Sequence, residues 1–237
     1  MTTPSAAPAA EQINHTGSYY AASANPSPER PPLEGTHECD VCVIGAGFAG
    51  ISTALHLAEK GLKVYVLEAA KVAYGASGRN GGQIVNGYSR EYDTIKSRYG
   101  EDTANAVVGM SFEGGNIIRE RIAKYDIKCD LKNGGFFAAF TDKQMKGLEH
   151  GKKTWERFGH TGLEMFDKSR MPSVANTDIY VGGMLDHWGG HIHPMNLVLG
   201  QAAALESLGG KIFEQSRAVS VDKESFKPVV KTARGEV

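Results

Sequence analysis

Residues 39–68 constrain the fold more than any other part of the chain. A short apolar run, Val41 to Ile44, leads into three glycines spaced Gly-x-Gly-x-x-Gly, and apolar residues then recur with a helical period. A second apolar run, Val64 to Leu67, ends on Glu68. Strand, glycine turn, helix, strand and acidic residue in this order are typical of the βαβ unit that binds a dinucleotide. We therefore predict an α/β fold organised around a Rossmann-like dinucleotide-binding domain.

Each part of this unit has a physical role in binding a nucleotide. The three glycines permit a tight turn, a close approach of the backbone to a pyrophosphate, and packing of the helix on the strand. The N-terminus of the helix offers N–H groups and a partial positive charge to the phosphates. The acidic residue can accept hydrogen bonds from ribose hydroxyls and would repel a 2′-phosphate. The cofactor contacts predicted here are Gly45, Ala46, Gly47, Phe48, Ala49, Gly50, Glu68 and Ala69.

The segment that follows, residues 69–88, favours a flavin over a nicotinamide cofactor. Its many glycines disfavour a regular helix but allow the backbone to run close to a large flat ligand. A flexible surface loop is the alternative, and Arg79 could equally pair with a phosphate or a carboxylate. We assign further FAD contacts to Val219 and to this segment, at Gly75, Ala76, Ser77, Arg79, Asn80, Gly81, Gly82 and Gln83.

The whole chain predicts two domains preceded by an arm. Residues 1–36 are rich in Ala, Pro, Ser and Thr and are predicted to be disordered. Residues 37–92 and 194–237 are predicted to form an FAD/NAD(P)-binding Rossmann-like domain. Residues 93–193 are predicted to form an inserted α+β substrate domain. Because the sequence stops where a returning strand is expected, we expect the fold to be incomplete at its C-terminus.

Local signals predict several boundaries between elements. Gly100 separates two helices, and Thr141 with Gln144 forms a capping box at the start of another. Pro194 is expected in the first turn of a helix. The pair Asn133-Gly134 predicts a turn between two short strands.

Charge and cysteine content exclude some functions. The formal net charge is −1, so neither nucleic acid nor an anionic membrane is an expected partner. We find neither a transmembrane run nor a secretory signal, which favours a cytoplasmic location. Cys39 and Cys42 have the spacing of a redox pair, but on a strand their odd separation points them to opposite faces. Two small buried residues are therefore expected there.

Two histidines are the candidates for a substrate pocket. His191 and His193 are two apart, so a strand would place them on one face. A metal site would need a third ligand, and none has a recognisable spacing, so no metal is predicted. The alternative is a structural role near a helix start, which His187 and Trp188 share. With no Gly-x-Ser-x-Gly elbow, the catalytic residue stays unassigned.

Five segments resemble the FAD-dependent amine oxidoreductases of the glycine oxidase and D-amino acid oxidase type. They read S-Y-Y-A-A-S-A-N (18–25), C-D-V-C-V-I-G-A-G (39–47), G-A-S-G-R-N-G-G-Q (75–83), F-E-G-G-N-I-I-R-E-R-I (112–122) and L-D-H-W-G-G-H-I-H-P (185–194). The glycine fingerprint is shared by many flavoproteins, whereas the first and last segments are far more specific.

The resemblance implies FAD as cofactor and oxidative deamination of a small-molecule amine in putrescine catabolism. The implied substrate is gamma-glutamylputrescine. Its terminal amine would be oxidised to an imine by hydride transfer to the flavin, and water would release ammonia and gamma-glutamyl-aminobutyraldehyde. Oxygen, the implied electron acceptor, would be reduced to hydrogen peroxide.

Three alternatives stay open. The substrate could be another amine, such as glycine, sarcosine or a D-amino acid. Members of the family are longer, so the chain could be a truncated product that binds the adenosine half of FAD without turnover. An NAD-dependent dehydrogenase fits the first βαβ unit but fits poorly with residues 75–83.

Overall fold

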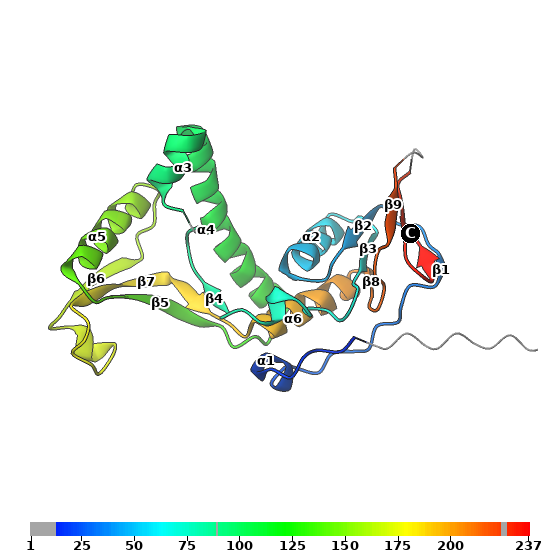
Figure 1. The fold of residues 1–237 in the computed structure, drawn as a ribbon, viewed down its shortest axis with the longest axis horizontal. Coiled ribbons are helices and arrows are strands. Elements are labelled where there is room, and N and C mark those ends of the chain that lie inside the picture. Colours follow the sequence, from blue (N-terminus) through cyan, green and yellow to red (C-terminus); the bar gives the residue numbers. More distant parts are fainter. Residues whose placement is uncertain (1–12, 89, 224–226) are drawn as a thin grey trace, which may run out of the picture. The chain divides into compact units, whose positions relative to one another are not determined.

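The computed structural model describes residues 13–88, 90–223 and 227–237. Two compact units divide the chain. The first unit combines Met1–Asn80 with Pro194–Val237, and the second is Gly81–His193 (Figure 1). Among the described residues, none of the helices combines the length and the apolar character that crossing a bilayer requires.

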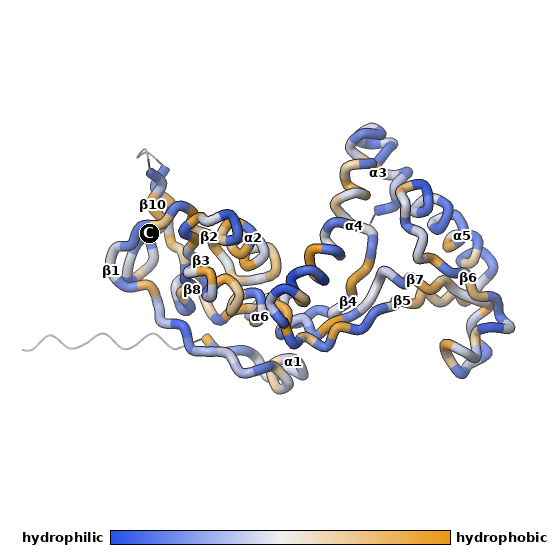
Figure 2. The backbone as a smooth tube through the Cα atoms, turned by 180° about the vertical axis from the view of Figure 1, so that it is seen from behind, coloured by the Kyte–Doolittle hydropathy of each residue, from blue (hydrophilic) through white to orange (hydrophobic). Residues whose placement is uncertain are grey.

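A parallel sheet forms the centre of the first unit. Its order is β2 (Val41–Ile44), β3 (Val64–Leu67) and β8 (Lys211–Phe213). The middle strand is buried along its whole length, and Figure 2 shows hydrophobic residues along β2 and β3. Two helices, α2 (Phe48–Glu59) and α6 (Pro194–Ser207), pack on each other, and α2 also contacts β3. The predicted strand–turn–helix–strand order is therefore confirmed.

A second sheet, of four short strands, completes the first unit. Its order is β1 (Gly35–Thr36), β11 (Gly235–Glu236), β10 (Val229–Lys231) and β9 (Ser220–Asp222). A cluster of buried side chains joins it to the parallel sheet, because residues from both sheets and from the segment before β1 contribute to it. These are Leu33, Tyr65, Leu67, Phe213 and Val230.

The segment before β1 differs from the predicted disordered arm over residues 13–36. A short helix, α1 (Tyr19–Ala22), begins after Ser18, whose hydroxyl accepts the N–H of Ala21. Leu33 is fully buried, and so is almost all of the Arg30 side chain. The prediction of disorder used amino-acid composition alone. Composition gives no information on single residues, such as Arg30 and Leu33, that are buried by contacts with residues far away in the sequence. Residues 1–12 of the predicted arm lie outside the described residues.

The second unit is built on an antiparallel sheet. The long strand β7 (Gly182–His191) pairs with β4 (Gln83–Ile84), β5 (Lys132–Ala139) and β6 (Leu163–Asp167). A single 3₁₀ turn, η2 (Met171–Ser173), lies between β6 and β7.

Three helices accompany this sheet: α3 (Tyr92–Tyr99), α4 (Glu101–Lys124) and α5 (Asp142–Glu156). The break between the first two falls at Gly100, as predicted, and the φ of +87° there suits glycine. Both α3 and α5 are largely hydrophilic along their length (Figure 2).

The start of α5 confirms the predicted cap at Thr141, while the reciprocal bond of Gln144 goes to the residue before the cap. The Thr141 hydroxyl accepts the N–H of Gln144 at 3.3 Å, and the Gln144 side-chain oxygen accepts the N–H of Phe140 at 2.7 Å. These two bonds satisfy N–H groups that would otherwise be unpaired at the helix start. Pro194 likewise begins α6 as predicted.

The predicted turn at Asn133-Gly134 is wrong, because one strand, β5, runs through it. The pairing register with β7 shifts between Asn133 and Gly135, and Gly134 has a φ of +93°. The same glycine that suits a hairpin turn also suits a bulge within a strand, so the dipeptide alone did not distinguish them.

Candidate nucleotide-binding site

The glycine turn lies between β2 and α2. Gly45 has a φ of +99°, and its N–H donates to the Leu67 carbonyl at 2.8 Å. A Cβ on Gly50 would approach the Gly45 carbonyl oxygen to 1.9 Å, so only glycine fits there. The first turn of α2 therefore packs closely on the glycine turn and on β2, which is the role of the third glycine in the dinucleotide fingerprint.

Glu68 is turned toward this same turn. Its Oε2 accepts the N–H of Ala46 at 2.7 Å, and its Oε1 accepts the N–H of Ala70 at 2.9 Å. The acidic residue at the end of β3 is thus fixed beside the glycines, where the fingerprint needs a ribose acceptor.

Ser77 brings the following loop to the N-terminus of α2. It lies in a 3₁₀ turn, η1 (Ala76–Gly78), and its Oγ accepts the N–H of Phe48, the first residue of α2, at 2.9 Å. A Cβ on Gly47 would come within 2.8 Å of that same oxygen. Loop and turn therefore meet where an anion would bind. The residues present fit a dinucleotide.

Arg79 and Asn80 hold the shape of their own loop. The Arg79 guanidinium stacks over the Tyr74 ring at 4.9 Å, and its Nε donates to the Tyr74 carbonyl at 2.9 Å. The Asn80 side chain donates to the carbonyls of Ala76 and Ser77.

Glu214 anchors the backbone of the loop at Lys71 and Val72. The carboxylate follows β8; its Oε1 accepts the N–H of Val72 at 2.9 Å, and its Oε2 lies 3.3 Å from Lys71 Nζ. Arg30 Nη1 lies 3.8 Å from the same carboxylate. A buried carboxylate is stable here because it has both hydrogen-bond donors and cationic neighbours.

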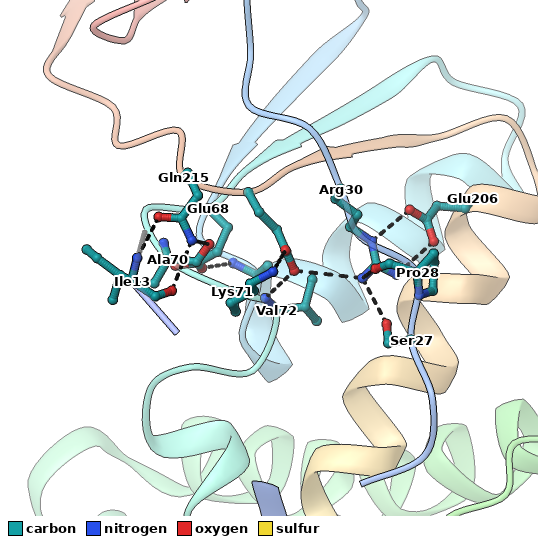
Figure 3. A network of polar contacts seen from close by, with 12 residues as sticks. Ile13, Ser27, Pro28, Arg30, Glu68, Ala70, Lys71, Val72, Glu206 and Gln215 are labelled. Carbon is teal, nitrogen blue, oxygen red and sulfur yellow. Dashed lines mark hydrogen bonds and ion pairs between the residues drawn. The ribbon is translucent and has the colours of Figure 1, made fainter. Parts of the chain in front are cut away.

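Arg30 ties the N-terminal segment to α6 (Figure 3). Its Nε and Nη2 each donate to Glu206 at 2.8 Å, a bidentate arrangement, and Nη1 donates to Ser27 Oγ. The arginine side chain is 3% exposed. Planar bidentate pairs of this kind combine strength with a fixed geometry.

Gln215 links the N-terminal segment to the loop directly (Figure 3). Its side-chain amide forms two hydrogen bonds with the backbone of Ile13, at 3.0 and 2.9 Å, and also donates to the Ala70 carbonyl. The next residue, Ser216, donates its N–H to the Glu68 carbonyl at 2.7 Å. The backbone that carries Glu68 and Ala70 is thus held by a segment about 145 residues away in sequence.

His15 also lies against this loop, stacked on Tyr74 at 6.3 Å. Burial lowers the pKa of His15, and the positive charges of Lys71 and Arg79 act in the same direction, while Glu214 opposes them. The imidazole is accordingly favoured in its neutral form beside a loop that already carries two cations.

Sequence reasoning missed this network. Its members come from four parts of the chain, and the one visible signal was that Arg30 is the only Lys or Arg among the first 36 residues. Members that reasoning from the sequence did not select are Ile13, His15, Arg30, Lys71, Glu206, Glu214 and Gln215.

The remaining predicted cofactor residues are divided between the units. Val219 belongs to the first unit, where it is exposed and donates its N–H to the Lys231 carbonyl. Gly81, Gly82 and Gln83 belong to the second.

In the second unit, Gly82 and Gln83 lie next to the segment that contains His191 and His193, the two histidines predicted to line a substrate pocket. Gln83 pairs with His191 between β4 and β7, and the N–H of Ile192 donates to the Gly82 carbonyl. The expectation that both histidines share a strand face is wrong, because β7 ends at His191. His191 is exposed, whereas His193 is buried and donates its N–H to the Cys129 carbonyl.

The cysteines are free thiols with little thiolate character. Burial raises the pKa of Cys42 to about 11, and it also raises the pKa of Cys39. Neither has the lowered pKa of a reactive cysteine. Within the described ranges, no three or more His, Cys, Asp or Glu side chains gather in a way that could hold a metal ion.

Comparison with known proteins places this geometry in a family. The family model described as "FAD dependent oxidoreductase" (DAO) matches residues 40–237. The gamma-glutamylputrescine oxidoreductase of Escherichia coli (strain K12) is 51% identical over 94% of this chain and 52% of its own length. A probable oxidoreductase, OrdL, of Haemophilus influenzae (strain ATCC 51907 / DSM 11121 / KW20 / Rd) is 46% identical over 94% of this chain and 52% of its own. The chain thus spans about half the length of these curated relatives.

Solved structures share the fold. Glycine oxidase from Geobacillus kaustophilus aligns with a TM-score of 0.71 at 18% identity, over 84% of this chain and 53% of its own. L-amino acid deaminase from Proteus myxofaciens, in complex with anthranilate, aligns with a TM-score of 0.74 at 22% identity, over 90% of this chain and 46% of its own. With the family model covering most of the sequence, the chain belongs to the DAO family of FAD dependent oxidoreductases, whose cofactor is FAD.

Proposed function

We propose that this chain forms the nucleotide-binding part of an enzyme that oxidatively deaminates gamma-glutamylputrescine. The proposed substrate is supported by the 51% identity to the Escherichia coli gamma-glutamylputrescine oxidoreductase over nearly the whole chain. The proposed products are gamma-glutamyl-aminobutyraldehyde, ammonia and hydrogen peroxide, with oxygen as the electron acceptor.

The residues of the first unit have distinct roles in this proposal. The glycine turn and the α2 N-terminus accommodate the pyrophosphate, and Glu68 accepts hydrogen bonds from the ribose. Ser77 lies at the same helix end and orients the loop that continues toward the flavin. When bound, FAD supplies the hydride acceptor for the carbon next to the amine.

Residues of the second unit complete the assignment. Gly81, Gly82 and Gln83 continue the flavin-binding loop, and Val219 of the first unit is a further proposed contact. His191, paired with Gln83, and its neighbour His193 are proposed to contact the amine substrate. Because Gln83 and His191 are paired strand residues, the backbone fixes the distance between the proposed flavin contact and the proposed substrate contact.

An amine panel tests the proposed reaction. The flavin-loaded protein is incubated with gamma-glutamylputrescine, putrescine, glycine, sarcosine and D-alanine, and hydrogen peroxide is measured. We expect the gamma-glutamylated amine to be preferred. A higher kcat/KM for glycine, sarcosine or D-alanine would replace the proposed substrate by an amino acid.

The 237-residue chain by itself supports a second, narrower candidate function. Its first unit holds a glycine turn, a ribose acceptor and a loop contact together, while the chain spans about half the length of its curated relatives. Binding of the adenosine half of FAD without turnover is therefore the alternative. Saturable FAD binding with no peroxide from any amine would favour it.

A further inference from the structure

Three consecutive residues after β8 join two parts of the first unit that are separate in the sequence. Glu214, Gln215 and Ser216, which we call the bridge, contact the loop that follows β3 (residues 68–73) on one side. On the other side they contact the N-terminal segment (residues 13–33). All three regions belong to one compact unit. The bridge therefore connects the N-terminal segment with the loop that carries the proposed ribose acceptor.

On the loop side, the bridge holds alternate residues by their backbone. The carbonyls of Glu68 and Ala70 accept the N–H groups of Ser216 and Gln215, at 2.7 and 3.0 Å. Two residues further on, Val72 donates its N–H to the carboxylate of the bridge at 2.9 Å. The path of the loop is thus fixed at three successive points.

The same three bridge residues bond to the N-terminal segment. Ile13 forms two backbone hydrogen bonds with the side-chain amide of Gln215, at 3.0 and 2.9 Å (Figure 3). Leu33 donates its N–H to Ser216 Oγ at 2.8 Å, and both residues are buried. The carboxylate of the bridge lies 3.8 Å from Arg30 Nη1. Each bridge residue therefore contacts one residue of the loop and one of the N-terminal segment.

Two residues of this arrangement have a left-handed backbone. The φ of Gln215 is +51°, and that of Ala73, at the end of the loop, is +63°. Neither residue type favours this conformation, so the surrounding contacts must hold it. Ala73 donates its N–H to the Ala46 carbonyl at 3.0 Å, and Ala46 donates its own N–H to Glu68 Oε2. The loop thus holds the glycine turn on both sides of Ala46.

We propose that residues 13–33 belong functionally to the nucleotide site, because they act through the bridge to position Glu68 against the glycine turn. With the segment in place, the ribose acceptor is fixed before the nucleotide arrives, and binding costs less conformational entropy. When contacts with the segment are lost, the loop populates other conformations, and the apparent affinity falls with the fraction of competent chains. Gln215 and Ser216 are positioning residues, since neither is a proposed nucleotide contact.

This inference rests on the proposed role of the first unit in binding the adenosine half of FAD. ADP is therefore the probe, because it carries the ribose and the pyrophosphate without the flavin. The 237-residue chain and its variants are titrated with ADP by isothermal calorimetry. Circular dichroism first establishes that each variant is folded, so that the titration reports affinity and not stability.

Two substitutions weaken the contacts with the N-terminal segment and keep the backbone of the bridge. Ser216→Ala removes the acceptor of the Leu33 N–H but keeps the N–H that bonds to Glu68. Gln215→Asn keeps a side chain that tolerates a positive φ, but it is one methylene too short for Ile13. We expect either substitution to weaken ADP binding about threefold, and the two together about tenfold or more.

Thr36→Ala is the matched control for the loss of a hydroxyl. The Thr36 hydroxyl is exposed and donates to Glu236 on the paired strand β11, at 3.4 Å. We expect the affinity of this variant for ADP to equal that of the wild type. If the double variant of the bridge does not fold, each single variant still gives the comparison with Thr36→Ala.

A double-mutant cycle separates positioning of Glu68 from general support of the fold. If the segment acts through Glu68, the bridge substitutions should weaken ADP binding by less than about twofold in a Glu68→Gln background. Fully additive losses would overturn the positioning role, and so would wild-type ADP affinity in folded bridge variants. Absence of ADP binding by the wild type would overturn the proposed nucleotide role itself, so the two failures are distinguishable.

Discussion

The two units hold their candidate sites in different ways. In the first unit, the candidate site consists of the glycine turn at residues 45–50 and the adjacent Glu68, so one short stretch of sequence contains most of it. In the second unit, a cavity takes its polar side chains from residues 86–88 and 90–93, from α5 and the turn after it, and from β7. A site made of consecutive backbone is visible in a sequence, and one made of distant side chains is not.

The largest loss of stability and binding is expected from a substitution in the glycine turn of the first unit, which we call the backbone-built site. Gly50→Ala would place a Cβ 1.9 Å from the Gly45 carbonyl oxygen. We expect FAD binding to be lost and the free energy of unfolding to fall by about 3 kcal/mol, since the turn cannot shift without moving β2. Urea denaturation and flavin fluorescence measure the two effects.

The control is an alanine at another helical glycine. Gly114 in α4 is exposed and a Cβ there would meet no atom within 4 Å. Gly114→Ala should raise stability by about 0.5–1 kcal/mol. Equal losses in both variants would mean that the turn is no more constrained than an ordinary helix.

A slightly smaller effect is expected where the first unit does depend on distant side chains. Arg30→Met removes the bidentate partner of Glu206 and one cationic neighbour of Glu214. We expect the free energy of unfolding to fall by about 2 kcal/mol, because both carboxylates lose a charged partner, although Glu214 keeps Lys71. Hydrogen exchange should rise at residues 70–72.

Arg234→Met is the matched control for this arginine. Its guanidinium lies 3.7 Å from Glu34, and both side chains are about half or more exposed. Such pairs contribute little, so stability should change by less than about 0.5 kcal/mol. If the two variants behave alike, the Arg30 network is no more important than a surface ion pair.

This contrast explains how much of the molecule could be predicted. The glycine spacing and the acid after the second strand predicted a βαβ unit, and the structure places Glu68 against Ala46 as that unit requires. The cap at Thr141 and the break at Gly100 were also readable, since each acts within one turn of backbone.

Other features depend on contacts over long sequence separations. Arg30 and Glu206 are 176 residues apart, so the composition of the N-terminal segment predicted disorder where a buried ion pair holds it. His160 gave no sequence signal, because the residues that contact it, Trp188 and Asp186, lie on β7, more than 25 residues away. The turn predicted at Asn133-Gly134 failed because pairing with β7 continues through it.

Glu68→Gln tests the acidic residue of the backbone-built site, and a smaller effect is expected than for Gly50→Ala or Arg30→Met. The amide can accept at one oxygen only, so it cannot hold both the Ala46 and the Ala70 N–H groups. We expect FAD affinity to fall about tenfold and the free energy of unfolding to fall by about 1 kcal/mol, because one backbone N–H loses its acceptor. Isothermal calorimetry gives the affinity. A tighter complex in the variant would mean that Glu68 does not face the ribose.

The smallest expected effect is a pH dependence that belongs to the second unit. The pKa of His160 is lowered from 6.5 in the folded state, chiefly by burial. Protonation therefore favours the unfolded chain: the stabilisation from neutral His160 is present above pH 6.5 and is lost as the pH falls through the folded pKa. Urea midpoints of the wild type and of His160→Phe should converge toward pH 5. Parallel curves would show that His160 titrates normally.

Nucleotide selectivity of the 237-residue chain tests the central claim most directly, because the first unit is assigned the adenosine and pyrophosphate half of FAD. Purified chain is titrated with FAD, ADP, FMN and NADH. The account predicts saturable binding of FAD that ADP displaces, no measurable binding of FMN, weaker binding of NADH, and no FAD binding by Gly50→Ala. Binding of FMN as tight as that of FAD, or FAD binding that survives in Gly50→Ala, would contradict it.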